Sequence, residues 1–236
     1  MITNEMMQPW SMELTDSPHH RCKPVQGVGT NDMTGCRRCV DGKEQAHPCY
    51  RSWANLLTRT YDPKFKEIRS QRYAEVADDW KTLSGFYEFW KAQPYYPGGH
   101  LESDLLSAAR GLPKAYTPET ACCVPKQINT LLNARGKHRG ELPQGVTRSW
   151  RGYKAQLGKG SEGQWYSSTI HDLAEALDVY WSAKLPYALT TAYELLEGHP
   201  ERDALMLGIK ITLRNQHEEA YRHLNEVLEC QQTKAK

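Results

Sequence analysis

Residues 145–168 consist of three short strand-like runs separated by glycine turns. The runs cover 145–149, 153–157 and 164–168, with turns at 151–152 and 158–163. Short runs containing valine, tyrosine and tryptophan, with turns this close together, are typical of antiparallel strands. Apolar residues at helical spacing follow at once, from Ile170 to about Lys184. The pattern predicts a three-stranded sheet with a helix packed against it.

Other stretches predict helices. Apolar residues recur at helical spacing in two places: Trp53, Leu56, Leu57 and Tyr61, and then Trp80, Leu83, Phe86 and Trp90. Asp62-Pro63 is expected to end the first helix and Pro94 the second. We interpret this aromatic stripe as core packing. A helix is also expected after Pro125 and over 203–230, and a short hairpin in the first part of 95–133.

The predicted fold class is α+β, in four parts. Residues 1–48 are polar and lack a sustained period, so we expect a loop-rich arm containing cysteines. Residues 49–133 form a mostly helical module, and 134–185 form the sheet-plus-helix domain. Residues 186–236 form a C-terminal helical segment.

Composition excludes some classes of protein. Of the 236 residues, 25% are charged, and apolar runs are only a few residues long, so no transmembrane helix is expected. The first ten residues lack a basic start followed by an apolar core, which is unlike a secretory signal. We therefore expect a protein without a membrane partner, located in the cytoplasm.

The charge is uneven along the chain, although the net charge is only +2. Residues 134–160 contain a single acid, Glu141, and seven basic residues, a net charge of +6: Arg135, Lys137, Arg139, Arg148, Arg151, Lys154 and Lys159. Residues 161–236 contain seven basic and twelve acidic residues, a net charge of −5. A basic segment in a near-neutral chain is the pattern that phosphate backbones attract, and a solvated loop is the alternative.

Seven cysteines, an odd number, argue against a secreted disulfide scaffold. Cys36, Cys39, His47 and Cys49 lie within 14 residues. Thiolates and imidazole are the ligands that tetrahedral zinc prefers, and a C-x2-C turn can present two sulfurs to one ion. The sequence therefore offers a structural zinc site, with plain thiols as the alternative, and His19, His20 or Cys22 could replace one ligand.

Several motifs resemble those of a known family. The first group is CYR-x-W at 49–53, the stretch from Trp80 to Trp90 at the end of an expected helix, HLESDLL at 100–106 and AYTPETACCVPKQIN at 115–129. The second group is Gly145-Val146, Trp150 and Tyr153-Lys154-Ala155. In this order they resemble phage-encoded proteins in which a degenerate HNH-type nuclease module precedes an Apetala (ethylene-response-factor) DNA-binding domain. The resemblance covers roughly residues 27–185. It implies an HNH-like (ββα) module over 49–133 and an Apetala-like domain over 134–185.

For the nuclease module, the resemblance implies a divalent-metal site that cleaves phosphodiesters. The matching strand contains Glu102-Ser103, where relatives have Asp followed by Lys or Arg and true HNH nucleases have Asp-His. Serine is not a base near neutral pH without an activating partner, so His100 is the candidate replacement. Glu102, Asp104 and Asn129 are the other candidate catalytic residues, with Mg²⁺ as the cofactor. Surface charges and an ordinary histidine are the alternative interpretation.

For the second module, the resemblance implies that the sheet enters the major groove of duplex DNA. The basic and aromatic candidates for DNA contact are Arg148, Trp150, Arg151, Tyr153, Lys154, Lys159 and Trp165. Arginine can pair with guanine edges or phosphate, and lysine supplies a point charge. For Trp150 and Trp165, core packing and DNA contact are both open.

The leading functional hypothesis is duplex-DNA binding by a phage-type protein related to HNH homing endonucleases, with residual cleavage left open. One alternative is an active endonuclease or nickase. The other is a catalytically inactive host-takeover or anti-defence protein that binds a host protein through its acidic C-terminal helices or its cysteine-containing arm.

Overall fold

The computed structural model describes residues 14–16, 23–40, 43–64, 75–95, 98–132, 142–159 and 163–234. Helices predominate, and the strands form small antiparallel sheets of two or three strands. The predicted α+β class is therefore confirmed. The chain divides into two compact units, Met1–Pro125 and Lys126–Lys236, described separately below. The four-part division of the chain stays a prediction.

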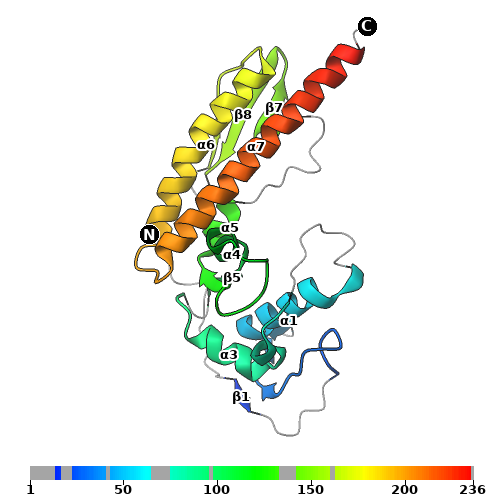
Figure 1. Cartoon of the computed structure of the whole chain (residues 1–236), viewed down its shortest axis with the longest axis vertical. Helices are drawn as coiled ribbons and strands as arrows, with labels where there is room; N and C mark the ends of the chain where they lie inside the picture. The colour runs from blue at the N-terminus through cyan, green and yellow to red at the C-terminus, as the bar shows by residue number, and fades with distance from the viewer. Residues whose placement is uncertain are drawn as a thin grey trace. The chain divides into compact units, whose positions relative to one another are not determined.

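The first unit mixes short strands and helices (Figure 1). Its elements are β1 (Thr15–Asp16), β2 (Met33–Thr34), β3 (Arg37–Val40), β4 (Lys43–Ala46), α1 (Pro48–Tyr61), η2 (Asp78–Lys81), α3 (Leu83–Lys91), β5 (His100–Glu102), α4 (Asp104–Arg110) and β6 (Cys122–Val124). The two helices expected from the aromatic spacing are present, and Asp62 caps the end of α1 as expected. The region expected to be loop-rich contains two antiparallel strand pairs, β1–β2 and β3–β4.

Aromatic side chains form the core of the first unit. Trp53, Trp80, Phe86 and Trp90 are each at most 2% exposed. The Trp53 indole N–H donates to the Trp80 carbonyl at 2.8 Å, which satisfies the polar atom of a buried ring. The Trp80 and Phe86 rings meet edge to face, with centroids 5.4 Å apart. The interpretation of the aromatic stripe as core packing is confirmed.

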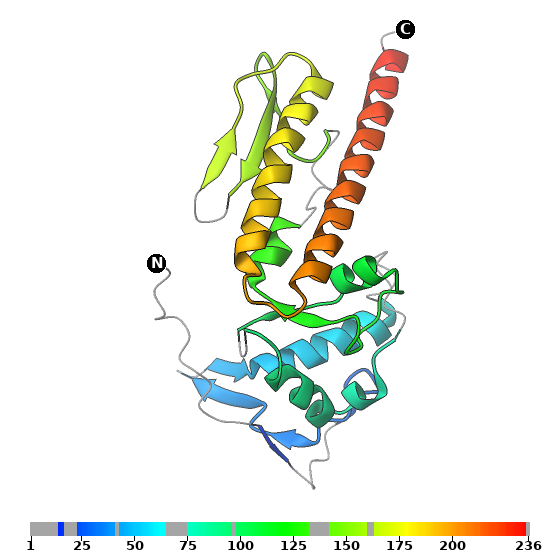
Figure 2. The ribbon, with the colours of Figure 1, turned by 60° about the vertical axis from the view of Figure 1, so that its left-hand side comes forward.

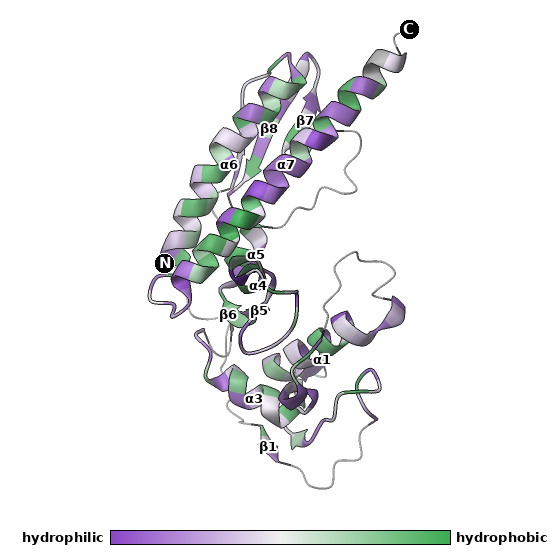
Figure 3. Cartoon of the chain, in the orientation of Figure 1, coloured by the Kyte–Doolittle hydropathy of each residue, from purple (hydrophilic) through white to green (hydrophobic). Residues whose placement is uncertain are grey.

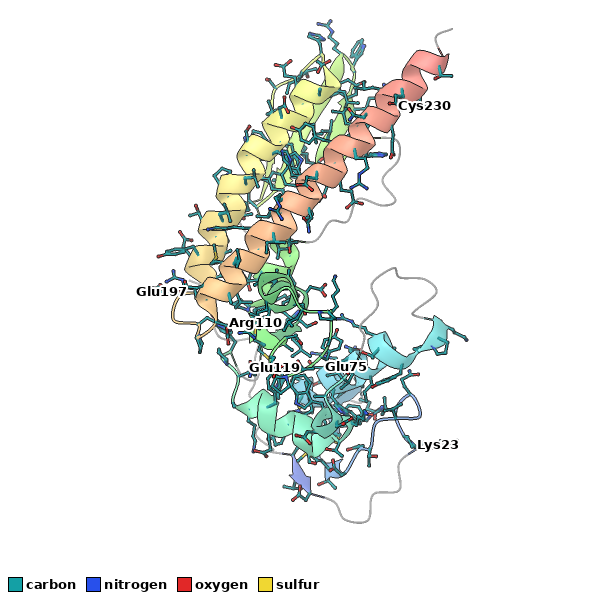
Figure 4. All side chains as sticks on the ribbon, in the orientation of Figure 1. Lys23, Glu75, Arg110, Glu119, Glu197 and Cys230 are labelled. Carbon is teal, nitrogen blue, oxygen red and sulfur yellow. The ribbon has the colours of Figure 1, made fainter. Side chains whose placement is uncertain are left out.

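The strands expected to form a hairpin are separated by a helix. β5 pairs antiparallel with β6, with His100 opposite Val124 and Glu102 opposite Cys122. Between them lies α4, which ends at Gly111 in the left-handed conformation (φ 64°). A side-chain nitrogen of Arg110 donates to the carbonyl of Glu119 (both labelled in Figure 4) and fastens the chain between α4 and β6. The simple hairpin expected here is therefore wrong.

The second unit contains the predicted sheet and its helix. Its elements are α5 (Lys126–Leu131), β7 (Val146–Ser149), β8 (Gly152–Gly158), β9 (Gln164–Tyr166), α6 (Leu173–Leu195) and α7 (Arg202–Lys234). The strands form an antiparallel sheet in the order β7–β8–β9, and α6 packs against β7 and β8. Figure 2 shows α6 between this sheet and α7. The helix is longer than expected and continues through Pro186.

Capping and burial explain the two long helices. The Asp172 carboxylate accepts the Glu175 backbone N–H at 2.8 Å and starts α6. Buried residues recur along both helices, and hydrophobic and hydrophilic residues alternate on them in Figure 3. Of the helices described, none is both long and apolar enough to cross a bilayer.

One polar bridge crosses the interior of the second unit. The Gln216 amide of α7 donates to the Leu132 carbonyl at 2.7 Å, and its oxygen accepts from the Lys184 ammonium of α6 at 3.3 Å. Lys184 is 3% exposed, with its ammonium 5.1 Å from the Trp181 ring centroid. Burial lowers the pKa of Lys184 to about 8.

Candidate nucleic-acid interface

The sheet of the second unit has one buried and one open face. Val146, Ala155 and Leu157 are buried, and α6 packs on the strands that carry them. Because side chains alternate along a strand, their neighbours point to the other face. In Figure 2 both α6 and α7 lie on one side of this sheet, so the open face is on the side away from the helices.

The open face carries hydroxyl, amide and amino groups. Thr147 stands opposite Lys154, and Gln156 stands opposite Tyr166. Tyr166 is 52% exposed, and its hydroxyl donates to the Gln164 side-chain oxygen at 2.8 Å. These groups can donate and accept hydrogen bonds, and Lys154 adds a positive charge.

The tip of the β7–β8 hairpin presents an exposed tryptophan beside an arginine. The Trp150 side chain is 94% exposed, the highest value among the exposed large hydrophobic residues described. The Arg151 guanidinium carbon lies 5.8 Å from its ring centroid, within cation–π range. The two residues border an open depression of about 390 Å³, which is also lined by Ser149, Thr169 and His171.

Backbone pairing holds the tip in place. The Tyr153 N–H donates to the Ile170 carbonyl at 2.7 Å, and the Ile170 N–H donates back at 2.9 Å. Gly152 adopts φ 150°, and a Cβ there would lie 2.2 Å from the Ile170 carbonyl oxygen. Only glycine allows this close approach. The segment that carries Thr169 and His171 is thereby held beside the hairpin.

The predicted DNA-contacting residues occupy different parts of this sheet. Lys154 lies on the open face, and Trp150 and Arg151 lie at the tip. By alternation, Arg148, Tyr153 and Trp165 belong to the face that α6 covers, although Arg148 itself is exposed. The Arg148 guanidinium lies 5.7 Å from the Tyr153 ring centroid, and the Lys159 ammonium 5.6 Å from that of Tyr187 on α6.

Sequence reasoning missed Thr169 and His171. Their place at the tip depends on the bridge between Tyr153 and Ile170, and no local sequence pattern predicts this pairing. The basic residues Arg135, Lys137 and Arg139 of the +6 segment lie outside the described residues.

The candidate nuclease residues are placed differently from expectation. Glu102 ends β5, and one carboxylate oxygen accepts the N–H groups of Asp104 and Leu105 at 2.8 and 3.3 Å. Glu102 therefore satisfies two backbone donors at the start of α4. Burial, together with the nearby charge of Asp104, raises the pKa of Glu102 to about 7.

Of the other candidates, His100 shares a strand face with Glu102, whereas Asp104 does not. Asp104 is the first residue of α4, so the expectation that it shares an alternating strand face with Glu102 is wrong. An Asp104 carboxylate oxygen lies 3.3 Å from the Lys114 ammonium. His100 is exposed and keeps the expected alternation with Glu102 along β5. Asn129 belongs to α5, in the second unit.

The proposed zinc ligands take part in local hydrogen bonds. The Cys36 thiol donates to the Met33 carbonyl at 3.3 Å, and His47 Nδ1 accepts the Cys49 N–H at 3.2 Å as the N-cap of α1. Burial, and then the proximity of the Cys123 and Cys36 sulfurs, raises the pKa of the Cys49 thiol far above its usual range.

No group of three or more His, Cys, Asp or Glu side chains in the described part of the chain is arranged to hold a metal ion. The Cys39 side chain, like His19, His20 and Cys22, lies outside that part. The zinc site therefore stays a prediction. Cys230 is exposed near the C-terminal end of α7 (Figure 4).

Searches of protein-family models, curated proteins and solved structures find no match for this chain.

Proposed function

We propose that the second unit binds duplex DNA through the open face of its sheet and the β7–β8 tip. One observation carries the proposal: Lys154 on the open face and Arg151 with Trp150 at the tip belong to one antiparallel hairpin. A β-ribbon fits the major groove of B-DNA, where hydrogen-bonding side chains can meet base edges. Binding of duplex DNA is therefore the function that this geometry supports best.

The side chains divide into two roles. Lys154 and Arg151 supply charge for phosphates, and the Thr147 hydroxyl can also donate to phosphate oxygens. Gln156 and Tyr166, which stand opposite each other on the open face, have groups suited to base edges. Most of the acidic residues that follow the sheet lie on α6 and α7, on the other side of it, where they do not oppose phosphate.

Fluorescence anisotropy with a labelled duplex tests the proposal. Arg151 at the tip and Lys154 on the open face are the described cations that this proposal assigns to phosphates, and two neutralised phosphates give a log–log salt slope of about −2. Lys154→Glu is expected to weaken binding about tenfold and to flatten the slope by about 1. Lys210→Glu makes the same charge change at an exposed position on α7 and is the matched control. A flat salt response, or equal losses in the two variants, would contradict the proposal.

Metal-dependent cleavage by the first unit is not part of this proposal. One oxygen of Glu102 is engaged by two N–H groups and Asp104 is paired with Lys114, so this arrangement does not fit a Mg²⁺ site. The cleavage hypothesis stays a prediction, to be tested by plasmid nicking with Mg²⁺ or Mn²⁺ for the wild type, His100→Ala and Glu102→Ala. Binding of a host protein also stays a prediction, to be tested by a pull-down after nuclease treatment.

A further inference from the structure

We propose that the depression at the β7–β8 tip takes an unpaired nucleobase of DNA, stacked against the Trp150 ring. This inference rests on the proposed DNA binding and adds a preference for a base displaced from the duplex stack. The site consists of Trp150 and Arg151 from the tip, Ser149 from the end of β7, and Thr169 with His171 from the adjoining segment.

The first argument is the exposure of the ring beside an open depression of suitable size. At 94% exposure, Trp150 contributes almost no burial to the fold, whereas Trp53 and Trp80 are core residues. The depression of about 390 Å³ lies toward the lower end of the range of small-molecule sites, roughly 300–1,000 Å³. Stacking on an aromatic ring is the common way in which proteins hold an unpaired base, because every base has a π-face.

The second argument is the chemistry of the lining. The Ser149 and Thr169 hydroxyl oxygens are 3.4 Å apart, and the His171 imidazole offers a further donor or acceptor. Bases present donors and acceptors at their edges, so hydroxyl and imidazole groups can meet them. The Arg151 guanidinium adds positive charge for the adjoining phosphate or a second stacking surface.

The third argument is that the backbone on the two sides of the site is joined by hydrogen bonds. The paired hydrogen bonds between Tyr153 and Ile170 hold its two sides together, and Gly152 permits their close approach. A site that is already in place loses less conformational entropy on binding than one that must order itself. The face of a paired base is covered by its neighbours in the stack, so the base that stacks on Trp150 is an extrahelical one.

Binding of the full chain to three labelled DNAs tests this proposal. One is a perfect duplex, the second contains a single-nucleotide bulge, and the third contains the same bulge without its base. We expect the full chain to bind the bulged duplex more tightly than the other two. Trp150→Ala is expected to weaken binding to the bulge by about 5- to 150-fold, the loss typical of one stacking contact. The loss of affinity for the perfect duplex is expected to be smaller than the loss for the bulge, since the perfect duplex offers no unpaired base to the Trp150 ring.

Tyr193→Ala is the matched control. Tyr193 is also an exposed aromatic residue, at 58%, and the Arg202 guanidinium lies 3.7 Å from its ring centroid. It lies near the other end of α6, about 30 Å from Leu173 along the helix at about 1.5 Å per residue. This variant is expected to bind all three DNAs like the wild type.

A second readout reports stacking directly. With 2-aminopurine as the bulged base, wild-type binding is expected to quench its fluorescence, and Trp150→Ala is not. Equal loss of affinity for all three DNAs in Trp150→Ala would overturn base stacking and leave duplex binding standing. Equal affinity of the wild type for the bulge with and without its base would do the same. Absence of binding to any of the DNAs would overturn the proposed function itself.

Discussion

Polar and aromatic side chains differ in their surroundings at two places: the junction of β5 and α4 at residues 102–104 of the first unit, called the corner below, and the β7–β8 tip of the second unit. At the corner, Glu102 accepts two backbone N–H groups of α4 and Asp104 pairs with Lys114. At the tip, Trp150 is almost fully exposed beside an open depression. The comparison teaches that a residue suited to chemistry is available to a ligand only where the local backbone does not already engage it.

The largest expected effect comes from the core that supports the corner. Trp53→Ala removes a fully buried ring and the donor to the Trp80 carbonyl, so the free energy of unfolding should fall by about 3–5 kcal/mol. Urea denaturation followed by circular dichroism measures the change. A loss below about 1 kcal/mol would contradict the assignment of this ring to the core.

The buried ammonium group of Lys184 tests how much the burial of a charge costs the second unit in stability. The pKa of Lys184 is lowered from 10.5 to about 8, so the unfolded chain binds more protons between these values and stability should rise with pH there. Lys184→Met should stabilise the protein by about 1–3 kcal/mol at pH 7, despite losing the Gln216 contact, and should remove that rise. Thermal unfolding from pH 7 to 10.5 measures both.

Lys210→Met, at an exposed position on α7, is the control for the buried ammonium. If Lys184→Met and Lys210→Met change the free energy of unfolding equally, the burial of Lys184 is not the cause of the stabilisation in Lys184→Met.

The corner should show the opposite dependence on pH. The pKa of Glu102 is raised from 4.5 to about 7, so the folded chain holds its proton longer and stability should fall as pH rises through this window. Glu102→Gln keeps an oxygen acceptor for the two N–H groups and should remove this fall. Glu102→Ala should also cost about 1 kcal/mol through loss of the acceptor. Unfolding curves at pH 4.5 and 7 separate the variants, and an unchanged slope in Glu102→Gln would refute the assignment.

The smallest expected effect is at the tip. Trp150→Ala should change the free energy of unfolding by less than about 0.5 kcal/mol, because the ring is 94% exposed. The urea midpoint tests this directly. A loss comparable with that of Trp53→Ala would show that the tip is part of the core, and the contrast between the two regions would fail.

Much of the fold could be predicted because the spacing of apolar residues along the sequence indicates which side of a helix or strand is buried. The helical spacing around Trp53 and Trp80 and the glycine-bounded strands of the sheet are local signals. The helix α4 was missed because the stretch after β5 is short and its start depends on Glu102, which accepts backbone N–H groups across the strand–helix junction. The strands β1 to β4 were missed because their stretch is polar and shows no sustained period.

The candidate site was less predictable than the fold. Lys154, Trp150 and Arg151 were identified by residue type, and alternation correctly separated Lys154 from Tyr153 and Ala155. His171 joins the tip through a bridge between residues 17 positions apart, which composition cannot reveal.

The Gln216 bridge has a practical consequence for dividing the protein into fragments. Its amide joins the Leu132 carbonyl to the Lys184 ammonium, so α7 supplies partners to the segment after α5 and to α6 at once. A fragment that stops before Arg202 would leave a buried ammonium without this acceptor and the apolar side of α6 without its cover. A fragment that stops near residue 185 would also cut α6 within its span. A fragment of the second unit that retains these contacts runs from α5 past Gln216, and continuing it beyond Val227 also keeps the buried Leu224 and Val227 of α7.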